Sequence, residues 1–242
     1  RQGVSFATAQ EIRNSIGISN PKAANGGAAA PTLNQLKSFV TATRTMQNRI
    51  VTTDDLLARI YTLPPEFGIV FRANVLPNPE NALSSILYVV SLDADSKLTT
   101  SSDALKKNLS TYLNEFRLIG DAMDILDASI INYQIKVTCR FAHSANKYEL
   151  ISLITREISK LYQRDSIALG KPIVKSDVTN VVINQPGVIS CVSVDLVNVA
   201  GEIDGREYST TTKNLEQSLK DDIYFAEPHE IYELRHPSND IL

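Results

Sequence analysis

The residues best suited to chemistry gather near the end of the sequence, in a segment that holds two of the three histidines of the chain. They are Glu227, His229, Glu230, Glu233 and His236. Carboxylates and imidazoles are common metal ligands, and a metal site needs two or three of them converging on one point. In an extended segment, residues at even offsets share a face, so His229 and Glu233 lie on one side and His236 on the other. We therefore interpret the segment as a solvated, charged strand, and predict no metal and no cofactor.

Other candidates for catalysis have simpler structural explanations. Asp54 and Asp55 are adjacent, but neighbouring residues of a helix point about 100° apart, and both fit a first helical turn capped by Thr52. His143 stands beside Ser144 with no patterned acid to orient it, although triad members can lie far apart in sequence. The sequence contains no nucleophile elbow, glycine-rich phosphate loop or zinc-ligand spacing. We predict no catalytic residues and a protein that is not an enzyme.

Composition limits the classes of partner. The chain has 242 residues, 43% of them hydrophobic and 21% charged, and a net charge of −3, so it can bury a core without disulfides or metals. Neither nucleic acid nor an anionic membrane is expected to attract it, and no apolar run approaches the roughly 20 residues that span a bilayer. Because it begins with Arg1, we expect a fragment or part of a longer chain.

The element expected to position the rest is a strand from Ile131 to Phe141. All its odd positions are apolar and all its even positions are polar, which is the pattern of a half-buried strand. Cys139 lies on its apolar face, whereas Cys191 alternates with polar residues in a later strand, so we predict two free thiols. Charge on the odd face, for example at Val137, should not be tolerated.

Hydrophobic periodicity and capping residues predict the surrounding elements. Helices are expected over 5–16, 32–46, 52–61, 102–119, 146–161 and 176–182, and strands over 70–76, 85–92 and 188–199, with Val192, Val194 and Leu196 on one side of the last. We predict an α+β fold: a mixed or antiparallel sheet with helices packed on one face, as in a ferredoxin-like plait, plus an N-terminal helical segment and a C-terminal arm. The expected parts are residues 1–84, 85–199 and 200–242.

The order of several short motifs resembles the baseplate J family of contractile phage tails. The motifs are Asn20-Pro21, Gly26-Gly27, Arg49-Ile50-Val51-Thr52-Thr53-Asp54-Asp55, Tyr112-Leu113, Leu169-Gly170-Lys171-Pro172-Ile173, Ser176-Asp177-Val178 and Pro186-Gly187-Val188. The match covers about 20–199, and Ala28-Ala29-Ala30-Pro31 replaces the acidic residues usual after Gly-Gly. The tail, 222–225 and 231–237, is similar to the end of the wedge subunit of T4-like phages.

The resemblance implies a structural protein of the virion. Wedge subunits associate with themselves and with other wedge proteins into a ring around the tail hub, which changes shape on contraction; they are assembled in the host cytoplasm. Homo-oligomeric contacts are therefore expected. Because such a subunit needs exposed contact patches, we predict an interface on the even face of the central strand and on the aromatic tail. Its residues are Asn132, Gln134, Lys136, Tyr224, Phe225, Ile231, Tyr232 and Leu234.

Two other classes of function stay open on the sequence. A small-molecule-binding or enzymatic ferredoxin-like domain predicts a concave pocket with convergent polar groups. An oligomeric adaptor outside phages predicts the same self-association without a tail assembly. The molecules that co-purify with the protein distinguish these possibilities.

Overall fold

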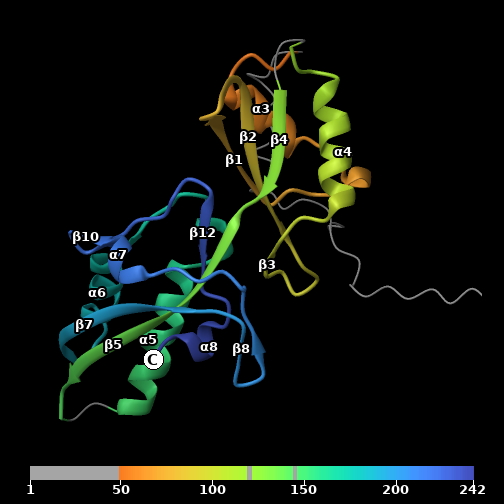
Figure 1. The fold of residues 1–242 in the computed structure, drawn as a ribbon. Coiled ribbons are helices and arrows are strands. Elements are labelled where there is room, and N and C mark those ends of the chain that lie inside the picture. The colour runs from red at the N-terminus through yellow and green to blue at the C-terminus, as the bar shows by residue number, and fades with distance from the viewer. Residues whose placement is uncertain (1–48, 119–121, 144–145) are drawn as a thin grey trace, which may run out of the picture.

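The computed structural model describes residues 49–118, 122–143 and 146–242, and the elements fall into two lobes (Figure 1). The helices predicted over 5–16 and 32–46 and the Asn-Pro and Gly-Gly motifs lie outside these residues. We call residues 49–127 the first lobe and residues 129–242 the second lobe, within the described ranges. The α+β class is confirmed.

The first lobe contains one mixed sheet and two main helices. Its elements are α3 (Thr53–Tyr61), η1 (Pro65–Phe67), β1 (Arg72–Asn78), β2 (Asn81–Leu92), β3 (Leu98–Thr99), α4 (Asp103–Asn114) and β4 (Ala122–Asp127). β2 pairs antiparallel with β1 and β3, and parallel with β4. A parallel neighbour needs a crossover, and α4 supplies it. The unit β2–α4–β4 therefore organises this lobe.

Local sequence signals determine where these helices begin. The Thr52 side chain accepts a hydrogen bond from the Asp55 amide, and the Asp55 carboxylate accepts one from the Thr52 amide, which is the predicted capping box. Ser102 caps α4 in the same position. The predicted stripe of α4 then packs on β2 in the core of the lobe, through Leu87, Val89, Leu105, Leu109 and Leu113.

The second lobe is built around β5 (Ser129–Phe141), the predicted central strand. β5 lies between β12 (Glu230–Glu233), which is parallel to it, and β7 (Val188–Val199), which is antiparallel. The other elements are α5 (Lys147–Leu161), η2 (Arg164–Ser166), β6 (Ile173–Val174), α6 (Lys175–Ile183), β8 (Glu202–Ile203), β9 (Arg206–Glu207), α7 (Leu215–Ser218), β10 (Leu219–Lys220), β11 (Ile223–Tyr224) and α8 (Pro237–Asp240).

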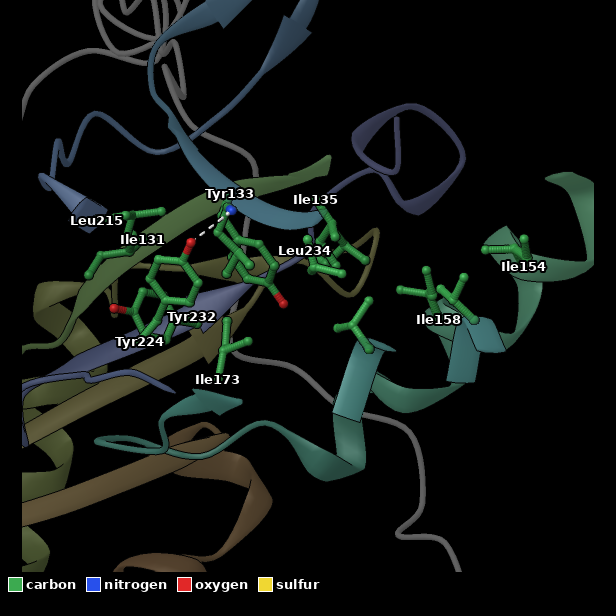
Figure 2. Close-up of a cluster of buried hydrophobic side chains, with 14 of the residues drawn as sticks. Ile131, Tyr133, Ile135, Ile154, Ile158, Ile173, Leu215, Tyr224, Tyr232 and Leu234 are labelled. Atoms are coloured by element: carbon green, nitrogen blue, oxygen red, sulfur yellow. Dashed lines mark hydrogen bonds between the residues drawn. The ribbon is translucent and has the colours of Figure 1, made fainter. Parts of the chain in front are cut away.

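The odd face of β5 enters the core, as the alternation predicts. Ile131, Tyr133 and Ile135 are buried against α5 and α6. Figure 2 shows Ile154 and Ile158 of α5 on one side of this cluster, and Tyr224, Tyr232 and Leu234 of the C-terminal segment beside Tyr133 and Ile135. Each large aliphatic side chain buried here contributes about 1.5–3 kcal/mol.

The lobes meet where one extended segment passes from the first sheet to the second. The Ala128 amide donates to Val89 of β2, and the next amide, that of Ser129, donates to His229 just before β12. A separate apolar cluster fills the joint, formed by Val90, Leu98, Ala128, Ile130 and Ile231. Polar contacts add to it: the Arg72 Nε donates to the Ile167 carbonyl at 2.9 Å.

Glu233 and Arg235 close the joint by binding both backbone groups of Leu98 in β3. The Leu98 amide donates to Glu233 Oε1 at 2.7 Å, and Arg235 Nη1 donates to the Leu98 carbonyl at 3.0 Å. Arg235 Nη1 also lies 3.1 Å from Glu233 Oε2. We call this arrangement the Leu98 clasp.

The single ferredoxin-like plait is not confirmed, because the helices divide between two sheets. α4 packs on β2, whereas α5 packs on β5. The longest strand that the sequence analysis missed is β4, whose Met123 and Ile125 alternate with outward-facing residues over a segment too short to stand out. The predicted division of the chain into residues 1–84, 85–199 and 200–242 stays a prediction. Its first boundary lies within β2, which spans Asn81–Leu92. No helix among the described residues is long and apolar enough to cross a bilayer.

Candidate interaction surface

Most of the aromatic tail predicted as an interface lies inside the protein. Tyr224, Ile231, Tyr232 and Leu234 are all buried. Tyr232 packs edge-on against Tyr133, with ring centroids 5.9 Å apart, and its hydroxyl donates to the Phe225 carbonyl at 2.8 Å. The tail is therefore no projecting arm in this fold: β12 completes the chain's own sheet.

Phe225 alone among the tail residues of the predicted interface reaches the surface, with 47% of its area exposed. The neighbouring Tyr224 instead caps the edge of β7, because its hydroxyl accepts a hydrogen bond from the Leu196 amide at 3.2 Å. A chain that ends at Lys220 would lack the whole aromatic tail, including the buried residues of β11 and β12. Such a truncation would therefore test folding rather than association.

Asn132, at the start of the predicted even-face interface, is also internal, with none of its surface exposed. Its Nδ2 donates to Glu233 Oε2 at 2.8 Å, and its Oδ1 accepts from the Ser209 amide at 2.6 Å. Asn198 Nδ2 donates to the Asn132 carbonyl at 2.8 Å. These hydrogen bonds connect β5 to β7, to β12 and to the loop after β9, and they satisfy the buried polar groups of Asn132.

The even face of β5 opens progressively toward its end. Gln134 is half-buried, and its Nε2 donates to Asp240 Oδ1 at 3.3 Å. Asp240 is buried and also accepts from the Tyr208 hydroxyl at 2.7 Å and from the His236 amide at 2.8 Å. Lys136 is exposed. Of the three predicted residues on this face, Lys136 is thus the one available to a partner.

β7 continues this exposed surface with aliphatic side chains. Ile189 is 66% exposed, Val192 60% and Val197 38%. Lys136 pairs with Asp195, and the exposed Thr138 and Arg140 pair with Ser193 and Ser190. We define the open face as these β5 and β7 residues: Lys136, Thr138, Arg140, Ile189, Ser190, Val192, Ser193, Asp195 and Val197.

The exposure of Ile189 and Val192 corrects the predicted pattern for this strand. The register shifts twice, between Thr138 and Cys139 and between Arg140 and Phe141, so Val192 and Ile189 are extra residues with no partner in β5. Val192 therefore does not share the buried side of Val194 and Leu196. A bulge carries no obvious sequence signal, which is why alternation alone gave the wrong face.

β7 is also an edge strand within the described residues. β5 pairs along one side of β7, and no described strand pairs along the other. Tyr224 covers this free edge at Leu196, whereas no backbone hydrogen bond from another described segment covers β7 between Ile189 and Asp195 on that side. Unpaired strand edges offer backbone donors and acceptors to another chain.

The five acidic and histidine residues that could have bound a metal are separated by individual contacts. His229 lies against the Tyr88 ring, with centroids 5.4 Å apart, and Glu230 forms a close ion pair with Lys213. Glu233 belongs to the Leu98 clasp, and His236 packs on Tyr208 at 5.3 Å. Across the described part of the chain, no group of three or more potential ligands comes together.

A small pocket lies between the end of α5 and the start of α6. Its lining includes Tyr133, Tyr162, Lys171, Asp177 and Tyr232, and the Tyr162 hydroxyl has no protein partner. Its volume of about 70 Å³ is well below the roughly 300 Å³ at which small-molecule sites usually begin. Burial raises the pKa of Tyr162, with a smaller contribution from Asp177. The pocket can hold water and does not favour a metabolite site.

Comparisons with known proteins give likenesses to solved structures but none to a family model or a curated protein. No protein-family model matches the sequence. No curated protein matches it. Among solved structures, the chain is similar to a chain in the cryo-EM structure of the anti-feeding prophage (AFP) baseplate, 6-fold symmetrised, with 14% identity and a TM-score of 0.48. The likeness covers 69% of this protein and 38% of that chain, so this protein spans about two fifths of its length. At this level of similarity it establishes no function.

Proposed function

We propose that the protein is a structural subunit of a phage tail baseplate, which works by contacting neighbouring subunits. The observation that carries the proposal is the open face, where Ile189, Val192 and Val197 expose aliphatic surface on a sheet. Exposed aliphatic residues gathered beside polar ones are typical of protein contact sites. Lys136 and Asp195 lie among them and can give a contact its orientation.

The type of assembly is proposed from the motif order in the sequence. Two of these motifs lie at the ends of elements: Thr52 and Asp55 form the capping box of α3, and Pro186-Gly187 form the turn before β7. From the resemblance we infer a wedge subunit that forms a ring around the tail hub by self-association and by contacts with other wedge proteins. Contraction rearranges these contacts, and the particle is a virion tail assembled in the host cytoplasm.

The first experiment identifies the partners. The full chain with an affinity tag is purified from cells that produce the tail, and the bound material is analysed by mass spectrometry and electron microscopy. A multi-subunit tail particle is the expected result. Recovery of a bound metabolite without other tail proteins would contradict the proposal and favour the enzymatic alternative, while self-association alone would favour an adaptor.

A second experiment tests the open face. The double substitution Val192→Asp and Val197→Asp places two charges on the proposed contact and should lower incorporation at least about tenfold, equivalent to about 1.4 kcal/mol. Ile203→Asp is the matched control, because Ile203 is an exposed aliphatic residue in the β8–β9 hairpin. Circular dichroism and melting temperature verify that each variant folds. Equal incorporation of all three proteins would exclude the open face as the contact.

A further inference from the structure

The bulge at Val192 has a chemical effect on the two cysteines of the chain. Val137 pairs with Val194 and Thr138 with Ser193. An unbroken register would then place Cys139 opposite Val192 and Cys191 opposite Arg140, on opposite faces of the sheet. The extra residue shifts the pairing, so that Cys139 and Cys191 are direct cross-strand partners. Directly opposed residues of antiparallel strands point to the same face.

The spacing of such a pair suits a disulfide. Opposed residues in antiparallel strands have Cα atoms about 4.5–5.5 Å apart, and disulfides join Cα atoms about 4.4–6.8 Å apart. Both side chains are half-buried and pack against the core of the second lobe beside Val137 and Val188. Both are free thiols in the structure.

The surroundings of the two thiols agree with this proximity. Burial raises the pKa of Cys139, and the neighbouring Cys191 raises it further. Burial also raises the pKa of Cys191, which a hydrogen bond with Thr179 partly opposes. Neither thiol is therefore activated by itself, and their nearness is what distinguishes them from two isolated cysteines.

We propose that Cys139 and Cys191 form an oxidation site, in which a small disulfide such as oxidised glutathione converts the pair into one cross-strand disulfide. The thiolate of one cysteine, its proton lost to solvent, attacks a sulfur of the oxidant and releases one glutathione thiol. The second cysteine attacks the resulting mixed disulfide and releases the other. The two cysteines lose two hydrogens, and the oxidant is reduced to two thiols. The bond fixes β7 to β5 where β7 has its bulges.

The experiment treats the purified full chain with oxidised glutathione, quenches with acid, and measures intact mass and free thiols in denaturant. The expected product is a monomer lighter by two hydrogens, with no free thiol, no glutathione adduct, and a linked peptide containing Cys139 and Cys191. Its melting temperature should rise by several degrees, because the bond restricts the unfolded chain, and dithiothreitol should reverse the change.

Single variants separate pairing from simple thiol reactivity. Cys139→Ser and Cys191→Ser each retain one thiol, and each should give at most a glutathione adduct. Two adducts on the wild-type chain, or a linked dimer of two chains, would overturn the proposal. So would two unreacted thiols under conditions that oxidise the urea-unfolded chain.

A trivalent arsenical supplies a test that does not depend on oxidation. Phenylarsine oxide joins two adjacent thiols through two arsenic–sulfur bonds and releases water. One equivalent should protect both cysteines of the wild-type chain from a thiol reagent, even when a monothiol is added to compete for the arsenic. In each single variant, the added monothiol should remove the arsenical and leave the remaining cysteine reactive. Failure to protect the wild type would show that the sulfurs cannot converge.

Discussion

The two ends of β5 have the same alternation of apolar and polar residues but stand in different surroundings. At the first end, β12 and β7 pair on both sides, and even the polar Asn132 is fully buried. At the far end, Lys136, Thr138 and Arg140 face outward, and β7 bulges beside them. A polar residue in an alternating strand thus marks a face, whereas tertiary contacts decide whether that face meets solvent.

The largest expected effect belongs to the buried end and appears at high pH. Burial raises the pKa of the Tyr133, Tyr162 and Tyr232 phenols above the ordinary value near 10. Their contribution to stability is complete below pH 10 and is lost as pH rises above it, at no more than about 1.4 kcal/mol per pH unit for a phenol that stays neutral in the folded state. We expect cooperative alkaline unfolding together with tyrosine ionisation, measured by absorbance and circular dichroism.

Tyr133→Phe is the matched variant for this prediction. It removes one group that must stay neutral in the fold, so the alkaline midpoint should move upward while the neutral-pH structure is kept. An unchanged midpoint would mean that Tyr133 ionises without unfolding, and that the first end of β5 is less closed than its packing indicates.

Asn132→Leu tests the buried amide and should have the largest effect among single substitutions of the even face. The Ser209 amide loses its acceptor, and Glu233 loses one of its three charge-stabilising donors inside the protein. We expect a loss of about 3 kcal/mol in the free energy of unfolding, measured by urea titration. A loss under about 1 kcal/mol would indicate that water reaches this end of the strand.

Gln134→Ala should have an intermediate effect, since Gln134 occupies the transition between the two ends. Its substitution removes one hydrogen bond to Asp240, which keeps those from Tyr208 and the His236 amide. We expect a loss of about 1 kcal/mol by the same urea titration. If Gln134→Ala lowered the free energy of unfolding as much as Asn132→Leu does, the proposed decrease in burial along the even face of β5 would be wrong.

Lys136→Ala should have the smallest effect on the isolated chain. The residue is exposed and pairs across the sheet with Asp195, which also contacts Lys175. The free energy of unfolding should change by less than about 0.5 kcal/mol. Within the proposed assembly, in contrast, the same substitution should weaken incorporation, so the two measurements together separate a contact residue from a structural one.

Local signals in the sequence were sufficient for much of the fold. The alternation of β5, the Thr52 capping box and the stripe of α4 all predict observed elements, because each depends on residues close in sequence. The distribution of helices over two sheets was not predictable in the same way. It depends on β4, and on pairing between β12 and β5 across about a hundred residues.

The candidate interface illustrates the same limit. Tyr232 and Leu234 were expected at the surface because aromatic and aliphatic residues in a polar tail are typical of binding arms, yet they enter the core of the second lobe. Ile189 and Val192 were not predicted to be exposed, since only the bulges turn them outward. Lys136 and Phe225 are the predicted interface residues that stay accessible.

The Leu98 clasp has a consequence for synthesis. Leu98 is held by Glu233, which lies 135 residues later, and by Arg235, which lies 137 residues later. A nascent chain therefore lacks these contacts to β3 until Glu233 and Arg235 have left the ribosome. The first lobe, although translated earlier, completes its contacts at β3 only after these two residues of the second lobe have been made.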